Sequence, residues 1–430
     1  MKISLLALGS QGDVQPFIAL ACGLAQHGHQ ARILAVADYE PLVRSYGVPF
    51  SAVGGSAEAL MDRELVYSFF DRKGNPLRMA EEFVRAASPY VVKLFEDCWQ
   101  ACRDSDVLIV SSLGIIVGCH IAEKLKIQCH VVHMHPNSPT GLHPHVFFSA
   151  LPAWAPLHRH YNRLTYKLGA QGMWQFLQGS LNAARREVLD LKPLSAAGYW
   201  RLASSNAPLT MYAYSERVAP RPTDWDPDLH VTGYWWLQPP ATWTPSPDLC
   251  AFLDDGPTPV YIGFGSNLIG RNPTQVTAMI VEALQEAGVR GILYSNWGDL
   301  SIAELPAGIL KITQTPHAWL FPHMAAVVHH GGAGTTAAAL RAGKPSIVVP
   351  FFGDQAFWAE RVFELGTGPR PIPRKQLDKQ RLKQAILSAV GNEGMRGRAA
   401  QLGESLRAED GVQRAVEIFN RYANHSDLGL

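Results

Sequence analysis

The densest group of residues able to do chemistry lies in the second half of the chain. His329-His330-Gly331-Gly332-Ala333-Gly334-Thr335-Thr336 follows a β-branched apolar run and precedes a helical pattern, so it is predicted to connect a strand to a helix. Glycines let a backbone approach a ligand, and the free amides at a helix start suit a diphosphate. His330 and Thr335 would add side-chain donors. The segment predicts an anion-binding loop.

Two other interpretations of glycine-rich segments stay open. The loop lacks the lysine of a Walker A sequence, which argues against ATP hydrolysis, but its glycines could serve only a tight turn, with His330 filling space. Gly263-Phe264-Gly265-Ser266-Asn267 is a second glycine turn after a strand, and Ser266 could meet phosphate there. A plain turn explains this second segment equally well.

A carboxylate and a carboxamide follow the next predicted strand. Asp354 and Gln355 come after Pro350-Phe351-Phe352-Gly353, at the same sheet edge as the glycine loop. Asp accepts hydrogen bonds while Gln donates and accepts, so the pair can bracket the vicinal hydroxyls of a sugar. Asp354 is also expected to be the N-cap of the following helix, which explains the Asp but not the Gln.

The first half of the chain offers a general base. Asp13 follows Gly9-Ser10-Gln11-Gly12 at the end of the first predicted strand. Deprotonation of an attacking hydroxyl needs one base within hydrogen-bond reach, and Asp13 is the candidate. Simple capping of the helix that follows is the alternative. Ser10 and Gln11 are expected on the acceptor side of this loop.

Histidines and aromatics further along suggest an acceptor region. His133, His135, His143 and His145 cluster after a strand, but Pro136, Pro139 and Pro144 make the segment irregular, so a metal site is disfavoured and an acceptor-side lining, with His135 as a competing base, is preferred. The following aromatics include Phe147 and Trp174. Each alone is better explained as core, but together they would suit a flat apolar acceptor.

The elements that position these residues alternate between strand and helix. Strands are expected at 3–8, 31–36, 106–110 and 128–133, with helices at 16–26, 40–46 and 115–124. After 247 the alternation restarts, with strands at 260–263, 291–294, 310–312, 326–329 and 346–349 and helices at 273–287, near 318 and at 335–342. Parallel α/β sheets are predicted in both halves.

A proline-rich stretch divides the two halves. The predicted organisation is an N-terminal Rossmann-like acceptor-binding domain (1–218), an interdomain linker (219–247), a C-terminal donor-binding domain (248–405) and a final segment (406–430) whose helix, 411–422, packs back on the first domain. In open α/β sheets ligands bind beyond the carboxyl ends of the strands. We therefore expect an α/β fold in which two Rossmann-like domains face each other across a cleft.

Composition excludes several classes of protein. The chain has 38 Lys and Arg against 37 Asp and Glu, so no net field favours nucleic acid as a partner. Its six cysteines are scattered without a CxxC pair, which favours reduced thiols. The first apolar run is too short for a signal peptide, and the run 107–122 is too short and polar to span a membrane. A soluble, cytoplasmic protein is expected.

Together the motifs resemble the inverting glycosyltransferases of the two-Rossmann GT-B fold. The resemblance is carried by residues 9–16, 231–235, 260–266, 316–322, 329–355 and 371–375, and sterol 3-beta-glucosyltransferases look nearest. Plant small-molecule glucosyltransferases and glycopeptide-antibiotic glycosyltransferases belong to the same family.

The resemblance implies roles for particular residues. His330 would contact the donor diphosphate, with Gly332 and Gly334 supplying amides and Thr335 a hydroxyl. Asp354 and Gln355 would hold the sugar, Ser266 would lie at the phosphates, and the Pro316-His317 turn would border the base. Asp13 would be the catalytic base. The co-substrate would be UDP-glucose or another UDP- or dTDP-sugar, with no cofactor and no catalytic metal.

The resemblance leaves the acceptor open. Asn267 stands where sterol enzymes commonly carry Met, and the region 133–199, where acceptors are chosen in this family, shows no match. Sterols, polyketides, flavonoids, carotenoids and terpenoids all remain candidates, and a lipophilic acceptor would leave peripheral membrane contact open. The alternatives to a UDP-glucose-dependent enzyme are a dTDP-deoxysugar-using natural-product glycosyltransferase, a nucleotide-sugar epimerase of the same fold, and a silent nucleotide-sugar-binding protein.

Overall fold

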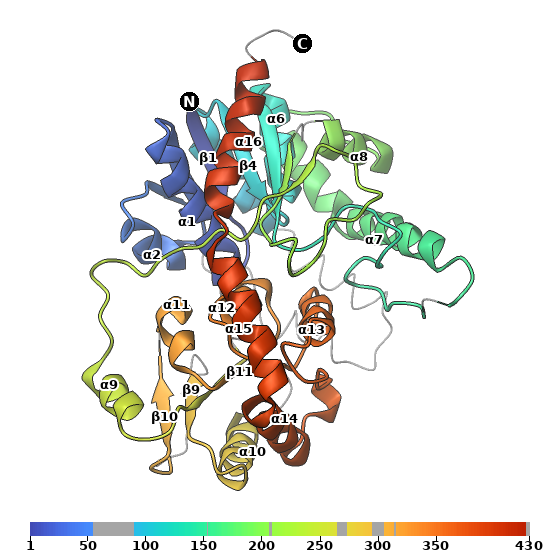
Figure 1. Ribbon diagram of the computed structural model, residues 1–430. Coiled ribbons are helices and arrows are strands. Elements are labelled where there is room, and N and C mark those ends of the chain that lie inside the picture. Colours follow the sequence, from blue (N-terminus) through green and yellow to red (C-terminus); the bar gives the residue numbers. More distant parts are fainter. Residues whose placement is uncertain are drawn as a thin grey trace. The chain divides into compact units, whose positions relative to one another are not determined.

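The protein divides into two compact units. The computed structural model (Figure 1) describes residues 1–54, 90–152, 154–205, 209–264, 273–294, 305–313 and 315–426. Unit 1 comprises Met1–Ser215, Arg221–Leu237 and Asp410–Leu430. Unit 2 comprises Glu216–Pro220 and Gln238–Glu409. The polypeptide therefore crosses between the units more than once.

Unit 1 is built on a seven-stranded parallel sheet. The strands are β1 (Lys2–Leu6), β2 (Gln30–Ala35), β3 (Phe50–Ala52), β4 (Val107–Ser111), β5 (Gln128–His133), β6 (Thr210–Tyr212) and β7 (Leu229–Val231). Their order in the sheet is β3-β2-β1-β4-β5-β6-β7. The chain reverses its direction of travel between β1 and β4, which places a topological switch point beside the loop that follows β1.

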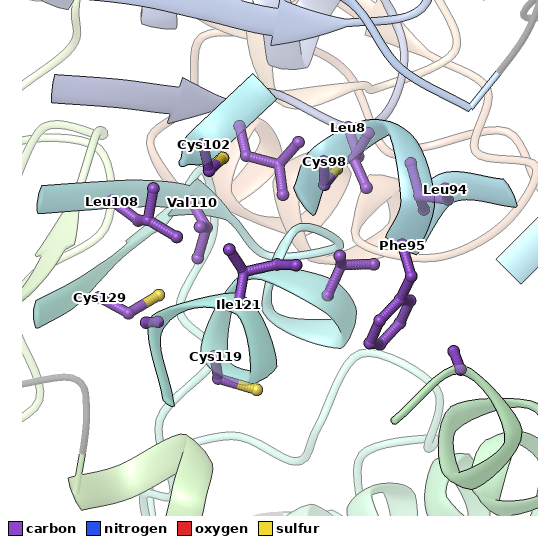
Figure 2. Packing of buried hydrophobic residues seen from close by; sticks show 14 of the residues in the cluster. Leu8, Leu94, Phe95, Cys98, Cys102, Leu108, Val110, Cys119, Ile121 and Cys129 are labelled. Carbon is purple, nitrogen blue, oxygen red and sulfur yellow. The ribbon is translucent and has the colours of Figure 1, made fainter. Parts of the chain in front are cut away.

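Helices and a mixed core complete unit 1. Its described helices are α1 (Gln11–Gln26), α2 (Glu40–Arg44), α6 (Ile115–Leu125), α7 (His158–Glu187), α8 (Ala196–Ser205) and α16 (Gly411–Ser426). Figure 2 shows Cys98 and Cys102 packed in the core with Leu8 and Leu94, and Cys119 and Cys129 belong to the same cluster. All six cysteines are free thiols, as the sequence predicts. Burial raises the pKa of Cys119 to about 12, so this thiol acts as packing.

A buried arginine joins α7 to α6. Arg185 is only 1% exposed, and its guanidinium makes a bidentate ion pair with the Glu123 carboxylate, at N–O distances of 2.6 and 3.1 Å. The same guanidinium donates to His120 Nδ1 (2.8 Å) and to the Lys192 carbonyl (2.7 Å). Each of these bonds is charge-assisted, and together they satisfy a cation that would otherwise be costly to bury.

The last helix packs on the first one. Gly23 of α1 lets α16 approach closely, because a Cβ at that position would lie 2.5 Å from Val412 Cγ1. His29 Nε2 donates to Asn420 Oδ1 (2.8 Å), and the rings of His29 and His130 meet Phe419 edge-on. The C-terminal segment thus contributes to the core of unit 1.

Unit 2 repeats the same strand order on a smaller scale. Its strands are β8 (Val260–Gly263), β9 (Gly291–Tyr294), β10 (Ile309–Ile312), β11 (Ala326–His329) and β12 (Ser346–Val348), arranged β10-β9-β8-β11-β12 and all parallel. Its helices are α9 (Pro247–Asp254), α10 (Pro273–Glu286), α11 (His317–Leu320), α12 (Ala333–Arg341), α13 (Gln355–Glu364), α14 (Lys379–Gly391) and α15 (Glu393–Arg407). The switch point lies between β8 and β11.

The predicted α/β class with two parallel sheets is confirmed, with differences in detail. The first helix begins at Gln11 and not at Pro16, so Pro16 lies inside α1. Strand β7 lies within the stretch 219–247, which the sequence predicts as a proline-rich linker with little room for a regular element. A three-residue edge strand fits between Pro227 and Pro239. Within the described residues, no helix is long and apolar enough to cross a bilayer.

Replacing Arg185 by leucine should destabilise unit 1. The change leaves Glu123 without its bidentate partner, and because Glu123 is one-third exposed, water offsets part of the loss. We expect a fall of about 2–3 kcal/mol in the free energy of unfolding, measured by urea denaturation. Arg186→Leu, at the adjacent exposed position, is the matched control and should change stability by less than about 0.5 kcal/mol. Equal effects of the two variants would contradict the structural role given to Arg185.

Candidate active site

Two of the loops singled out by the sequence lie at the switch points of the two sheets. In unit 2, the segment His329–Thr336 leads from β11 into α12, beside the carboxyl end of β8. In unit 1, Gly9–Asp13 leads from β1 into α1, beside the carboxyl end of β4. Each of these edges is where an open α/β sheet binds its ligand.

The turn after β11 is fixed by a buried histidine. His329 closes the strand, is fully buried, and its Nδ1 accepts the amide of Gly331 at 3.0 Å. Gly331 has φ +90°, and a Cβ there would lie 2.7 Å from Val348 Cγ1, so glycine is required at this position. The first histidine of the pair is therefore a structural element of the loop.

The second histidine is placed differently. His330 Nδ1 is buried and has no hydrogen-bond partner among the described residues. Burial lowers the pKa of His330 to about 4, so the ring is neutral at physiological pH and can donate from one nitrogen only. A Cβ at Gly332 would lie 2.5 Å from His330 Nε2, so Gly332 makes room for the ring. The position of the His330 ring therefore depends on glycine at residue 332.

Helix α12 begins directly beside this ring. Gly332 is its N-cap, and both the amide and the hydroxyl of Thr336 donate to the Gly332 carbonyl at 2.9 Å. The amides of Ala333, Gly334 and Thr335 precede the first intrahelical bond and have no partner within the helix. Gly334 is exposed and Thr335 is half-buried. An anion fits this arrangement of donors and the positive end of the helix dipole.

A second loop of unit 2 is held by Gln355. This residue is 4% exposed, and its Oε1 accepts the amides of Phe351 (2.8 Å) and Phe352 (3.2 Å). Asp354 occupies the N-cap position of α13, but its side chain makes no capping bond. Instead its Oδ2 accepts the indole N–H of the buried Trp358 at 3.0 Å. Asp354 therefore lies at the expected N-cap position, but the expected capping hydrogen bond is not formed, because the carboxylate binds the indole instead.

The His317 ring packs against aromatic side chains near the same sheet edge. Its ring stacks on Phe321 at 4.3 Å between centroids, and its Nε2 lies 3.3 Å from the Tyr261 hydroxyl. Burial, followed by the proximity of His330, lowers the pKa of His317 to about 4. Ser266, the remaining residue predicted at the phosphates, lies outside the described residues.

In unit 1, the Asp13 carboxylate is locked to the loop. Ser10 is the N-cap of α1, and Asp13 is the third residue of the helix. Asp13 Oδ2 accepts the Ser10 amide at 2.8 Å and the Ser10 hydroxyl at 3.0 Å. Asp13 is therefore not the N-cap residue itself. Its carboxylate, at the third position of the helix, accepts from the N-cap residue Ser10 and so forms part of a capping box. Gln11 is exposed at the start of α1.

Gly9 keeps the space that this carboxylate needs. Gly9 has φ +137°, and a Cβ there would lie 2.3 Å from Asp13 Oδ2. Gly12, which directly precedes Asp13, has no such restriction, because the nearest neighbour of a Cβ there would be Ser10 Oγ at 3.5 Å. Gly9 thus leaves room for the Asp13 carboxylate, just as Gly332 leaves room for the His330 ring.

The acceptor candidates divide into a structural and an accessible group. His133 ends β5, is buried, and its Nδ1 lies 2.7 Å from Ser112 Oγ, while burial lowers its pKa to about 3. Trp174 is 3% exposed and stacks on Tyr199 in the core, so little of its surface is left for a ligand. His135 is half-buried and Phe147 is 60% exposed. Within the described chain, no three His, Cys, Asp or Glu side chains meet as metal ligands would.

Several supporting residues were not found from the sequence. Ser111 Oγ accepts the amide of Leu8 (3.1 Å) and donates to the Leu8 carbonyl (3.0 Å), which ties the loop after β1 to the end of β4. Trp358 orients Asp354 from one helical turn away. The position of Ser111 at the end of an apolar strand could have indicated its role. No pattern in the sequence indicates the pairing of Trp358 with Asp354.

Two family models match the chain in the places where the candidate residues lie. Residues 3–144, which include Asp13, match the glycosyltransferase family 28 N-terminal domain. Residues 294–419, which include His330 and Asp354, match the erythromycin biosynthesis protein CIII-like C-terminal domain. The chain belongs to the GT-B glycosyltransferases.

Fungal sterol 3-beta-glucosyltransferases are relatives over almost the whole chain. The protein from Neosartorya fischeri is 38% identical over 98% of this chain, and the one from Cryptococcus neoformans is 36% identical over 98%. These alignments cover 29% and 27% of the fungal proteins, so this chain spans less than a third of their length.

Solved structures of this family share the fold. The glycosyltransferase VinC, solved in complex with DTDP, aligns over 99% of this chain and 100% of its own with a TM-score of 0.68 at 20% identity. The glycotransferase of kitacinnamycin aligns over 98% of each chain with a TM-score of 0.67 at 18% identity. At these identities the comparison shows the GT-B fold alone.

Acid should destabilise unit 2 through its buried histidines. The pKa of His330 in the folded state is about 4 against an ordinary value of 6.5, so between these values the unfolded chain binds more protons. The contribution of neutral His330 to the free energy of unfolding should be fully present above pH 6.5 and should decrease as the pH falls toward 4. Urea unfolding of wild type and His330→Gln across this range measures the effect, and the variant should show a shallower decline. Identical pH slopes would show that His330 is not buried as described.

Proposed function

We propose that this protein is an inverting glycosyltransferase that moves a hexose from a nucleoside diphosphate sugar to a hydroxyl of an apolar small molecule. The head of α12 carries the proposal, because free amides, a neutral histidine with one buried ring nitrogen and a glycine that accommodates the ring suit a diphosphate. UDP-glucose is the proposed donor, and no metal or cofactor takes part.

The leaving group would be stabilised at the head of α12. As the bond between the anomeric carbon and the diphosphate breaks, the electron pair and its negative charge pass to the phosphate oxygen. The amides of Gly332, Ala333 and Gly334, the hydroxyl of Thr335 and the dipole of α12 are fixed before the charge develops, so they need no reorganisation. A neutral His330 donates one hydrogen bond to the same group.

Asp354 is proposed to accept from the sugar hydroxyls. Its other role, accepting the Trp358 indole, holds the carboxylate in one orientation. We assign Gln355 to positioning, since its carbonyl oxygen already holds the amides of Phe351 and Phe352. His317 and Ser266 are proposed to flank the donor, at the base and at the phosphates respectively.

Asp13 is proposed as the general base. It would take the proton of the acceptor hydroxyl as that oxygen attacks the anomeric carbon from the face opposite the diphosphate, which inverts the centre. The two hydrogen bonds from Ser10 fix one carboxylate oxygen and so direct the group. The proposal requires the carboxyl edges of the two sheets to face one another during the reaction, and closure of the units around both ligands is expected.

The acceptor is proposed to be a sterol or a similar fused-ring alcohol. The fungal relatives are named for glucosyl transfer to sterols, and they align through the acceptor-side unit as well as the donor-side unit. Phe147, His135 and the Ser10-Gln11 turn are the proposed acceptor contacts. The neighbouring structure with DTDP makes dTDP-sugars the second donor class to examine.

The reaction itself is the first test. Incubating the protein with a panel of UDP- and dTDP-sugars and apolar alcohols should give a hexose adduct, detected by mass spectrometry. With α-linked UDP-glucose as the donor, NMR of the product should show the β configuration. Asp13→Asn should lower kcat by about 10²- to 10⁴-fold while UDP still binds, because only the proton acceptor is lost. Near-normal turnover would move the base elsewhere, with His135 next. Release of an isomerised sugar nucleotide without an acceptor would instead identify an epimerase.

Two glycines that precede Asp13 provide a matched pair of variants for that test. Gly9→Ala brings a Cβ within 2.3 Å of the carboxylate and imposes an L residue at φ +137°, so its kcat should fall with that of Asp13→Asn. Gly12→Ala meets only Ser10 Oγ at 3.5 Å and should keep most of its activity.

A second glycine pair tests the anion site directly. Gly332→Ala forces the His330 ring to move and should weaken UDP binding about tenfold, the value of one good hydrogen bond, as measured by isothermal titration calorimetry. Gly397→Ala, in α15 of the same unit with open space at its Cβ, is the control and should bind UDP normally. Unchanged affinity in Gly332→Ala would place the diphosphate away from His330.

A further inference from the structure

A buried tyrosine hydroxyl lies against His317 in unit 2. Tyr261 is the second residue of β8 and is only 1% exposed. Among the described residues its hydroxyl has one hydrogen-bond partner, the Nε2 atom of His317 at 3.3 Å. A phenylalanine would fill the same apolar core without the cost of burying a hydroxyl. The hydroxyl is therefore best explained by what it does to His317.

The strand brings this hydroxyl to the carboxyl edge of the sheet. Side chains two residues apart share one face of a strand, so the Tyr261 ring lies on the face of residue 263. A Cβ at Gly263 would lie 2.6 Å from Tyr261 Cζ and closer still to the hydroxyl, so the ring extends along the strand over this glycine. Gly263 pairs with His329 of β11, where the glycine loop begins. Glycine at residue 263 thus lets the hydroxyl reach the edge of the candidate donor site.

The His317 ring is neutral and fixed in its orientation. One face stacks on Phe321 with 14° between the ring planes, and the Tyr261 ring meets it at 76° with the centroids 5.8 Å apart. Burial is the main cause that lowers the pKa of His317 to about 4, and it raises the pKa of Tyr261 well above its ordinary value. At neutral pH the imidazole therefore carries one proton, on either Nδ1 or Nε2.

The hydrogen bond with Tyr261 decides which nitrogen carries that proton. A phenol is a stronger donor than a neutral imidazole N–H, and an unprotonated imidazole nitrogen is a stronger acceptor than a phenol oxygen. The Tyr261 hydroxyl therefore donates to Nε2, which leaves the proton of His317 on Nδ1. His317 is half-buried, and its Nδ1 has no hydrogen-bond partner within the described part of the chain. This N–H can serve a ligand.

We propose that Tyr261 is a positioning residue that fixes the Nδ1–H tautomer of His317, and that this N–H donates to an oxygen of the donor nucleoside. The inference rests on the proposed function only in placing the nucleoside beside His317. A fixed N–H favours a ligand that presents an acceptor oxygen and opposes one that presents an amino group. Uracil and thymine have a carbonyl oxygen at position 4 of the base, where cytosine has an amino group. The tautomer would thus contribute to the choice of nucleotide.

NMR of the histidine side chains tests the tautomer without turnover. In protein with isotope-labelled histidine, the His317 signals are assigned by their absence in His317→Gln, and wild type should carry the proton on Nδ1. Tyr261→Phe removes only the hydroxyl, so the proton should be distributed over both nitrogens. Tyr294→Phe is the matched control, because the Tyr294 ring also meets His317 edge-on while its hydroxyl bonds to no described residue. This variant should keep the wild-type tautomer.

Nucleotide binding tests the consequence of the tautomer. In Tyr261→Phe the affinity for UDP should fall about tenfold, the value of one good hydrogen bond, while the affinity for inorganic pyrophosphate should stay within about twofold of wild type. The KM for the donor should rise with little change in kcat. A smaller loss for CDP than for UDP would assign the hydrogen bond to the carbonyl at position 4. An equal loss would assign it to another oxygen of the nucleoside, and either result supports the proposal.

Three outcomes would overturn the proposal. These are a wild type whose His317 proton is on Nε2, a Tyr261→Phe variant that keeps both the tautomer and the UDP affinity, and a variant that loses UDP and pyrophosphate affinity equally. The last result would show that Tyr261 supports the whole donor site and not one tautomer. Circular dichroism checks that the variants fold. Absence of glycosyl transfer together with the expected tautomers and affinities would contradict the proposed function and leave the role of Tyr261 standing.

Discussion

The fit between glycine and histidine at the head of α12 is the constraint on which the candidate site depends. His330 has a buried ring nitrogen without a partner, and its ring occupies the volume that any side chain at residue 332 would need. Such an arrangement leaves a polar group unsatisfied in the free protein, and a ligand that accepts hydrogen bonds and carries negative charge relieves this. Free amides at the helix start point to the same class of ligand. The buried His329 and Gln355 hold the two adjacent loops, so the donors are fixed before a ligand arrives.

Unit 1 uses the same device for a carboxylate. Gly9 vacates the volume that Asp13 occupies, and Ser10 holds one oxygen of the carboxylate through two hydrogen bonds. Both units therefore place a glycine, whose missing side chain leaves room, beside the candidate side chain of the loop that follows a switch-point strand. The repeated strand order explains why the two sites arise at equivalent places.

Much of this could be predicted because the signals are local. The strands 128–133, 260–263, 291–294 and 326–329 were located at both ends, since buried parallel strands are continuous β-branched runs bounded by turn residues. The loops that follow them were placed by the same pattern. The start of α1 was predicted too late, because proline is usually found in the first turn of a helix and Pro16 lies inside this one. The prolines around β7 concealed a short edge strand in the same way.

The partners of the site residues could not be predicted, because they depend on tertiary packing. Nothing local shows that Trp358 competes for the Asp354 carboxylate, that Gln355 holds backbone amides, or that Trp174 belongs to the core. Pattern alone could not separate Trp174, which is buried, from Trp154 and Phe147, which are exposed.

A crystal structure of the full chain with UDP tests the central claim most directly. We expect the diphosphate to lie within hydrogen-bond distance of the amides of residues 332–334 and of the His330 ring, with the ring in the same orientation as in the free protein. A nucleotide bound elsewhere, or bound with the His330 ring turned away from the phosphates, would contradict it.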